Sequence, residues 1–126
     1  MIILDEDVGN TVGWLGFDWE DIKVGRRVHL TGYPGDKPFR TMWHAACPLT
    51  TAQGRRMELQ CDSYFGMSGG PIYFVDDRDT ADTDDDLFTV WGPLTAEYTG
   101  AQQPYNIGRR LTESVVKMLV QWKTTH

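Results

Sequence analysis

Apolar and polar residues alternate along much of the chain, a period of two that is typical of half-buried strands. The alternation is clearest at Val28 and Leu30 and again at Met57 and Leu59. Turn-forming Gly, Pro and Asp residues separate such segments. The pattern predicts strands over residues 26–32, 39–47, 55–61, 71–75, 87–95 and 104–109. Strands of this length can close into one small antiparallel barrel that leaves no sheet edge exposed.

The apolar period changes from two to three and four near the C-terminus, which is typical of an amphipathic helix. Thr112 is placed to cap this helix, and Glu113 puts an acidic side chain in its first turn. The apolar positions on one face are Leu111, Val115, Met118, Leu119 and Trp122. We therefore expect an all-β fold, a six-stranded antiparallel barrel, with one C-terminal α-helix packed on it.

Length and composition agree with one compact domain. The chain has 126 residues, of which 40% are hydrophobic, enough for one core and too few for two large domains. No apolar run approaches the length of a membrane span, so we expect a soluble protein with no membrane partner. The apolar start at residues 1–4 is interrupted by acidic residues and does not resemble a signal peptide.

Negative charge is concentrated in one segment, residues 76–86. It holds seven aspartates and one arginine, a balance of −6 that equals the formal net charge of the whole chain. The spacing of Asp82, Asp84 and Asp86 is similar to the start of a calcium-binding EF-hand loop, but the loop glycine and the closing glutamate are absent. We favour a solvated, self-repelling loop over a calcium site, which stays open as the alternative. The chain has no basic stripe, which argues against nucleic-acid binding.

Glycines surround Ser68 in the stretch FGMSGGPIY, residues 65–73. Such a turn can expose the hydroxyl and direct backbone N–H groups at whatever the serine contacts, which suits a nucleophile. A plain turn between two strands is the alternative. The nucleophile elbow of α/β-hydrolases is excluded because it needs a helix after the serine, whereas residues 72–75 are β-branched and aromatic. It also needs a later histidine, and the one that follows is the last residue, His126.

The segment GMSGGP, residues 66–71, resembles the Gly-x-Ser-Gly-Gly-Pro signature of chymotrypsin-like serine proteases. In that family the nucleophile comes late in the chain, after the histidine and the aspartate. Residues 31–38 and 105–110 resemble the glutamyl-endopeptidase-like branch of the family, and so do residues 3–10 and 13–16. Together these segments span nearly the whole chain in the family's order.

The resemblance implies a secreted serine endopeptidase that hydrolyses peptide bonds through an acyl-enzyme, and we expect neither a metal nor a cofactor. Residues 1–126 would be the C-terminal, Greek-key barrel of a trypsin-like protease domain whose N-terminal barrel is missing. In the family that first barrel carries the histidine and the aspartate of the triad. The chain opens just past the place of the family's aspartate, so neither Asp5 nor Asp7 takes that role. We expect the chain to be inactive by itself, and the signal peptide to lie outside this sequence.

By the same resemblance, Ser68 attacks the substrate carbonyl, and the N–H groups of Gly66 and Ser68 bind the oxyanion. The residues expected to line the substrate pocket are Asp62, Ser63, Leu94, Thr95 and Glu97. Leu94 stands where glutamyl endopeptidases present a histidine, so a preference for glutamate is not expected. Asp62 stands where trypsin-like enzymes hold the residue that selects arginine or lysine, which leaves that preference open. Met67 replaces the aspartate that pairs with a freed N-terminus in digestive relatives, so that form of activation is not expected.

None of the three histidines stands in the Ala-Ala-His-Cys context of the family's base. His29 and His44 lie within predicted strands and His126 is terminal, so each is interpreted as a strand or surface residue. A non-catalytic protease homologue that acts as a protein-binding module is the alternative function. A barrel that stands alone is a third, disfavoured because the face that meets the first barrel would be apolar and wet.

Cys47 and Cys61, the two cysteines of the chain, end one predicted strand and the next, with a turn at Gly54 between them. A cross-strand disulfide can span this geometry. The resemblance to a secreted family favours such a bridge, which would place the protein in an oxidising compartment. Two thiolates in a hairpin without companion histidines fall short of the four ligands of a zinc site.

Overall fold

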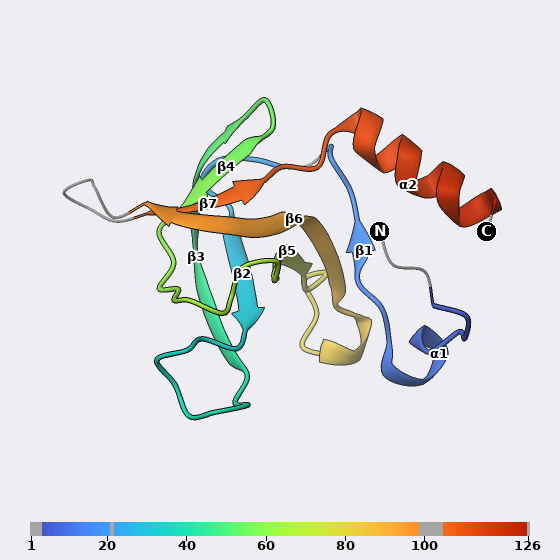
Figure 1. The fold of residues 1–126 in the computed structure, drawn as a ribbon. Helices are drawn as coiled ribbons and strands as arrows, with labels where there is room; N and C mark the ends of the chain where they lie inside the picture. The colour runs from blue at the N-terminus through green and yellow to red at the C-terminus, as the bar shows by residue number, and fades with distance from the viewer. Residues whose placement is uncertain (1–3, 21, 99–104, 126) are drawn as a thin grey trace.

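The computed structural model describes residues 4–20, 22–98 and 105–125 (Figure 1). Strands dominate this part of the chain, and a long helix follows them at the C-terminal end. The elements are α1 (Gly9–Val12), β1 (Gly16–Phe17), β2 (Arg27–Gly32), β3 (Trp43–Gln53), β4 (Arg56–Leu59), β5 (Pro71–Asp76), η1 (Thr83–Asp85), β6 (Leu87–Tyr98), β7 (Tyr105–Arg109) and α2 (Glu113–Thr125). The predicted all-β class with a C-terminal helix is confirmed.

The strands β2 to β7 close into an antiparallel barrel, as predicted. Their order is β6-β5-β2-β3-β4-β7, and β7 pairs again with β6. β6 closes the barrel because it pairs with two other barrel strands, β5 along its first half and β7 along its second half. Where the partner changes, a Cβ added to Gly92 would lie 1.8 Å from the carbonyl oxygen of Arg109. Glycine is required at this crossing because no side chain has room between the two backbones.

Inward-facing side chains of the strands form the core of the barrel. In β2, Val28 and Leu30 are fully buried and the intervening His29 is half-buried, which confirms the predicted alternation. Met57 and Leu59 repeat the pattern in β4. Among the described residues, the other large apolar side chains that are fully buried are Leu49, Ile72 and Trp91. Burial of one such side chain contributes about 1.5–3 kcal/mol, so these positions stabilise the closed barrel.

The strand β3 lies later in the chain than the predicted segment 39–47. It begins at Trp43 and continues to Gln53, because a tight turn lets it pair with β4 as far as Gln53 opposite Arg56. Pro48 lies inside β3, opposite Arg27 of β2, although proline is disfavoured within strands. Cys47 is therefore inside β3 and not at the end of a strand.

The elements α1, β1 and η1 were not predicted, since they are too short to give a periodic signal. β1 adds to the edge of β6 as a parallel strand, with Gly16 opposite Thr89 and Phe17 opposite Val90. Figure 1 shows how this pairing brings the N-terminal segment alongside the barrel. The added strand lies outside the closed barrel.

The acidic segment, residues 76–86, leaves the end of β5 and leads through turns and η1 into β6. Its carboxylates cap their own backbone: Asp76 accepts from the N–H of Arg78 and Asp82 from that of Asp84, each at 3.0 Å. In the described part of the chain, no three His, Cys, Asp or Glu side chains are grouped to hold a metal ion. The choice between a solvated loop and a calcium site stays a prediction.

The predicted C-terminal helix is confirmed as α2, but its burial differs from the expected apolar stripe. Val116 is its buried residue, whereas Met118 and Trp122 are 50% and 43% exposed. The chain just before the helix is held to the barrel, where the N–H of Leu111 donates to the carbonyl of Trp91 at 2.8 Å, and the helix then extends away from the barrel (Figure 1). Neither α2 nor any other helix among the described residues is long and apolar enough to cross a membrane.

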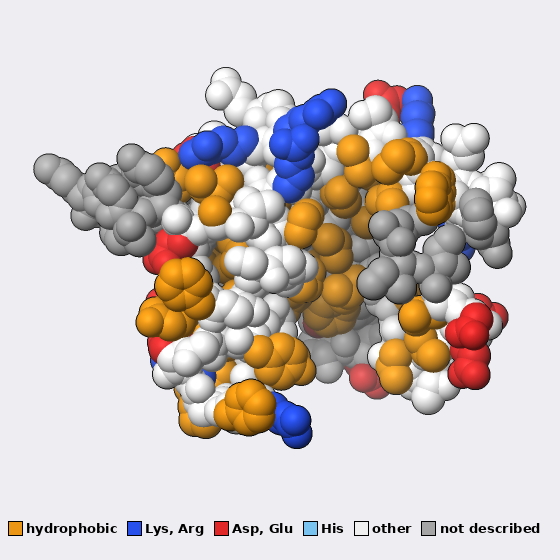
Figure 2. Space-filling view, in the orientation of Figure 1, with side chains coloured by type: hydrophobic (Ala, Val, Ile, Leu, Met, Phe, Trp, Pro, Cys, Tyr) orange, Lys and Arg blue, Asp and Glu red, His pale blue; other side chains and the backbone are white. Residues whose placement is uncertain are grey.

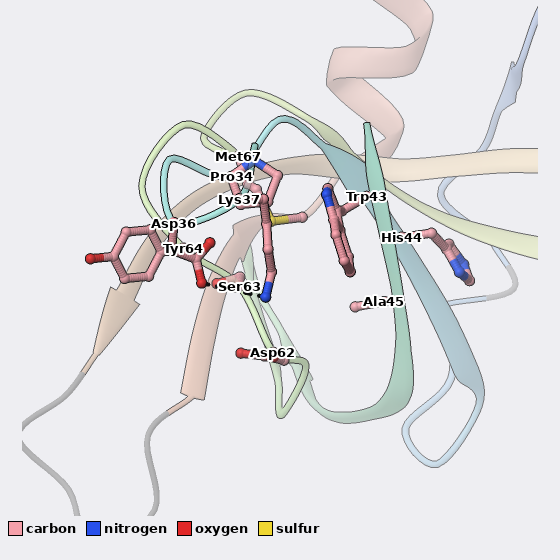
Figure 3. Close-up of a pocket in the computed structure, with 10 residues that line it drawn as sticks. All are labelled: Pro34, Asp36, Lys37, Trp43, His44, Ala45, Asp62, Ser63, Tyr64 and Met67. Carbon is pink, nitrogen blue, oxygen red and sulfur yellow. Dashed lines mark ion pairs between the residues drawn. The ribbon is translucent and has the colours of Figure 1, made fainter. Parts of the chain in front are cut away.

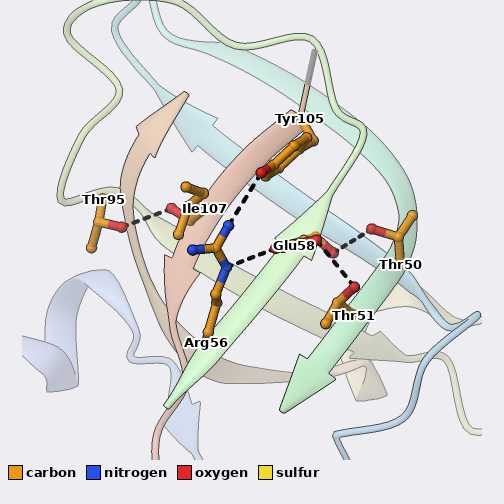
Figure 4. A network of polar contacts seen from close by, with 7 residues as sticks. All are labelled: Thr50, Thr51, Arg56, Glu58, Thr95, Tyr105 and Ile107. Carbon is orange, nitrogen blue, oxygen red and sulfur yellow. Dashed lines mark hydrogen bonds and ion pairs between the residues drawn. The ribbon is translucent and has the colours of Figure 1, made fainter. Parts of the chain in front are cut away.

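Polar contacts across three strands tie one side of the barrel together (Figure 4). Arg56 of β4 donates to the Glu58 carboxylate at 2.7 Å and to the Tyr105 hydroxyl of β7 at 3.3 Å. Thr51 of β3 donates to the same carboxylate at 3.2 Å.

The predicted disulfide is also present, joining Cys47 of β3 to Cys61 in the segment after β4. It anchors the chain that leads from β4 toward Ser68.

Candidate active site

Ser68 is exposed in the turn that precedes β5. Gly66 and Gly69, on either side of it, have positive φ angles of 100° and 86°. A side chain at Gly66 is also excluded by contact, because a Cβ there would lie 2.4 Å from the carbonyl oxygen of Tyr33. The glycines therefore give the turn a backbone conformation that other residues rarely adopt, and this conformation exposes the serine.

The amide groups of this turn divide into bonded and free ones. The N–H groups of Met67, Gly69 and Gly70 donate to backbone carbonyls at 3.2, 2.7 and 2.9 Å. Those of Gly66 and Ser68 donate to no backbone carbonyl within the described residues. Two free donors on alternate residues can converge on one acceptor, as an oxyanion site requires.

Neighbouring hydrogen bonds fix the direction of both free amides. In a planar trans peptide, the C=O and the N–H point in opposite directions. The carbonyl of Phe65 accepts from the N–H of Gly35 at 2.6 Å, so the N–H of Gly66 points away from Gly35. The carbonyl of Met67 accepts from Gly70 at 2.9 Å, which turns the N–H of Ser68 away from Gly70 in the same manner. Both donors are oriented before any ligand arrives.

A hollow of about 620 Å³ opens beside Ser68. Its lining is largely apolar and comes from the barrel, the 33–42 loop and the N-terminal segment. The side chains that shape it include Leu15, Thr31, Met42, Tyr73 and Phe88. Figure 2 shows hydrophobic side chains spread over one face of the molecule, from the barrel to α2 and the N-terminal segment. Ser68 thus has both free amides and a cleft beside it.

Asp62 and Ser63 line a second hollow, of about 230 Å³ (Figure 3). Lys37 lies in it, with its Nζ 3.7 Å from the carboxylate of Asp36 and 4.7 Å from the centre of the Trp43 ring. Met67 lines both hollows and is 4% exposed. Its side chain therefore lies between the hollow lined by Asp62 and Ser63 and the hollow beside Ser68.

The other predicted pocket residues follow one another on β6. Leu94 is buried, and its backbone binds the Ser68 turn twice, accepting from the N–H of Gly69 at 2.7 Å and donating to the carbonyl of Gly70 at 2.9 Å. Thr95 donates its hydroxyl to the carbonyl of Ile107 at 2.9 Å (Figure 4). Glu97 is exposed. The structure thus brings Leu94 to the turn through its backbone, and it leaves Thr95 and Glu97 on the outer part of β6.

Asn106 is a structural part of the site that the sequence reasoning missed. It is 1% exposed, and its amide donates to the carbonyl of Cys61 at 2.5 Å. Its side-chain oxygen accepts from the hydroxyl of Ser63. Asn106, which lies on β7, therefore fixes the segment that joins the disulfide to the Ser68 turn. A polar residue at an inward position of a predicted strand was the available signal.

The two described histidines, His29 and His44, lie together and not beside Ser68. Nδ1 of His29 is 2.8 Å from Nε2 of His44, and neither residue lines the hollow of Ser68. His44 borders the second hollow, but Figure 3 shows its ring pointing away from the other lining residues. Burial lowers the pKa of His29, and the nearby His44 and Arg27 lower it further. In the described residues, then, Ser68 has no histidine next to it.

No family model matches the chain, but related proteins do. It is 32% identical over 125 residues to a glutamyl endopeptidase of Bacillus licheniformis, over 98% of this chain and 38% of that protein. It is also 32% identical over 123 residues to a Bacillus subtilis protein named extracellular metalloprotease, over 96% of this chain and 36% of that protein. A solved structure of a Glu endopeptidase matches with a TM-score of 0.72 at 23% identity, over 95% of this chain and 52% of that one.

The closed barrel with its C-terminal helix is one half of the chymotrypsin-like serine protease fold, since it matches 52% of the solved Glu endopeptidase chain. The chain is a homologue of the glutamyl endopeptidases over nearly its whole length, which confirms the resemblance carried by its motifs. It spans little more than a third of the length of the curated relatives that it matches.

Proposed function

We propose that this chain is the nucleophile-bearing barrel of a serine endopeptidase. The observation that carries the proposal is an exposed Ser68 at a cleft, next to N–H groups of Gly66 and Ser68 that have no backbone acceptor among the described residues. The Bacillus licheniformis relative is named for cleavage at glutamyl residues. The Bacillus subtilis relative is named a metalloprotease, whereas the chemistry offered by the Ser68 turn is nucleophilic and supports the serine type.

In the proposed reaction, the Oγ atom of Ser68 attacks the carbonyl carbon of a peptide bond, and its proton passes to a base. The carbonyl oxygen becomes an oxyanion that accepts from the N–H groups of Gly66 and Ser68. Each such donor is worth about 3–4 kcal/mol in the transition state. The amine leaves with a proton from the conjugate acid of the base, and water then hydrolyses the acyl-enzyme.

We infer that the base and its orienting acid lie in an N-terminal barrel, so that this chain is the C-terminal one. The share of the relatives that it spans, 38% and 36%, leaves room for such a barrel. The N-terminal segment supports the inference, because its apolar side chains are exposed in isolation. These are Leu4, Val8, Val12, Trp14, Leu15 and Phe17. The proposed partners are thus a first barrel and a peptide or protein substrate.

Substrate preference and location are part of the proposal. A preference for glutamate is not proposed, because Leu94 is buried and apolar at the expected selector position. Selection of arginine or lysine by Asp62 is disfavoured as long as Met67 separates its hollow from that of Ser68. The disulfide between Cys47 and Cys61 supports secretion, because such bonds persist in oxidising compartments.

A fluorophosphonate probe tests the proposal, since it reacts with activated serines. We expect no rapid labelling of this chain by itself, and rapid labelling once the coding sequence upstream of Met1 is included. Ser68→Ala in the longer protein should abolish labelling. A longer protein that keeps an intact first barrel, stays unlabelled and still binds peptides would instead support the non-catalytic binding module.

A further inference from the structure

His29 and His44 form a pair on the outside of the barrel that the proposed hydrolysis does not use. They come from neighbouring strands, where His44 of β3 lies opposite Thr31 and His29 of β2 lies opposite Ala46. The two histidines are therefore diagonal neighbours on one face of the sheet. His29 is half-buried and His44 is exposed, so the pair is accessible from the side of His44.

The two rings face each other through nitrogen atoms. Nδ1 of His29 and Nε2 of His44 are 2.8 Å apart, while the ring centroids are 5.1 Å apart and the planes differ by 23°. A centroid distance so much longer than the nitrogen distance means that the rings meet edge to edge. One ring donates its N–H to the lone pair of the other. A neutral imidazole can carry its hydrogen on either nitrogen, so both facing nitrogens can present lone pairs at once.

We propose that His29 and His44 bind one divalent transition-metal ion between these two nitrogens, with solvent completing its coordination. Imidazole nitrogens bind such ions at about 2.0–2.1 Å. Two nitrogens that bind one ion at that distance are about 2.9 Å apart if the N–metal–N angle is a right angle, and about 3.3 Å apart if it is tetrahedral. The 2.8 Å of the hydrogen-bonded pair is close to the right-angle value, so that geometry needs less movement of His44 than the tetrahedral one. This spacing favours the tetragonal ions Cu²⁺ and Ni²⁺ over Zn²⁺.

The surroundings hold one ligand in place and leave the other adjustable. His29 is stacked on Tyr73 at a centroid distance of 5.4 Å, and the Tyr73 hydroxyl is hydrogen-bonded to Thr31 at 2.9 Å. The exposed ring of His44 can turn to direct its lone pair at a shared ion. The positive charge of Arg27 acts on His29 and opposes a cation. We therefore expect reversible binding that a chelator such as EDTA removes.

Competing ligands in the chain can be controlled. Both cysteines are joined in the disulfide, so neither offers a thiolate. His126 is the third histidine of the sequence and provides a matched control. The site does not depend on Ser68, so its failure and the failure of the proposed hydrolysis are separate outcomes.

The test is titration of the full chain, first stripped of metal with EDTA and dialysed, with CuCl₂, NiCl₂ or ZnCl₂ in isothermal titration calorimetry. We expect one ion per chain, with Cu²⁺ bound most tightly and Zn²⁺ least. Electron paramagnetic resonance of the Cu²⁺ complex should show coupling to two imidazole nitrogens. His29→Gln and His44→Gln should each weaken Cu²⁺ binding at least tenfold, whereas His126→Gln should leave it unchanged.

His44→Gln is the decisive variant. His44 is exposed, so its substitution leaves the core untouched, and near-ultraviolet circular dichroism can confirm that the variant is folded. Unchanged Cu²⁺ affinity in His44→Gln would overturn the site. A spectrum with one nitrogen or none would do so too, as would tighter binding of Zn²⁺ than of Ni²⁺, which contradicts the spacing argument.

Discussion

Replacing Gly66 with alanine would force two changes on the turn that carries Ser68. The residue has φ +100°, a conformation that costs a non-glycine residue about 1–3 kcal/mol. The new Cβ would also lie 2.4 Å from the carbonyl oxygen of Tyr33, so one of the two segments must move. That movement strains the hydrogen bond from Gly35 to Phe65, 2.6 Å long and worth about 1 kcal/mol. We expect Gly66→Ala to lower the free energy of unfolding by about 2–4 kcal/mol.

Gly69→Ala is the matched control for this prediction. Gly69 has a similar φ of +86°, but a Cβ there meets no atom within 4 Å. Its substitution therefore costs the backbone conformation without the clash, about 1–2 kcal/mol. Urea denaturation followed by tryptophan fluorescence measures both variants. Equal losses of stability in Gly66→Ala and Gly69→Ala would refute the reasoning, because the close contact with Tyr33 would then carry no cost.

Three further outcomes follow from the structure. Reduction of the disulfide between Cys47 and Cys61 should lower the free energy of unfolding by about 3 kcal/mol, measured by urea denaturation with and without dithiothreitol. The folded state lowers the pKa of His29 below its usual 6.5, so below pH 6.5 the unfolded chain binds more protons than the folded one. The free energy of unfolding should therefore decline as the pH falls below 6.5. In EDTA, His29→Gln should flatten this dependence of stability on pH. Asn106→Ala leaves the part-buried carbonyl of Cys61 without its donor and should cost about 1–3 kcal/mol. Glu97→Ala, at an exposed position on the neighbouring strand, should be nearly neutral in the same assay.

Local patterns predicted the elements well where they were long enough to show a period. The alternation at Val28 and Leu30 located β2, and the change of period at residue 111 located α2. The two-residue strand β1 gave no such signal, and its place beside β6 depends on pairing with a distant segment. The expected stripe of α2 was only partly buried, because a helix pattern indicates which face is apolar and not whether a partner covers it.

The candidate site also combines features that the local sequence predicted with features that depend on the tertiary structure. The glycines around Ser68 were a local signal, and the structure agrees with it, since Gly66 and Gly69 have positive φ angles and the serine is exposed. The wall made by Met67 between the two hollows was not foreseeable, because it depends on how loops far apart in the chain pack together.

Periodicity and turn residues predicted the barrel and the terminal helix, because these follow from neighbours close in the chain. The disulfide and the exposed serine were predicted with the help of the resemblance to a secreted protease family and its serine motif. The pairing of His29 with His44, and the support of Ser63 by Asn106, arose only on folding. Their residues are separated by 15 and 43 positions, and strand register and barrel closure decide which of them meet.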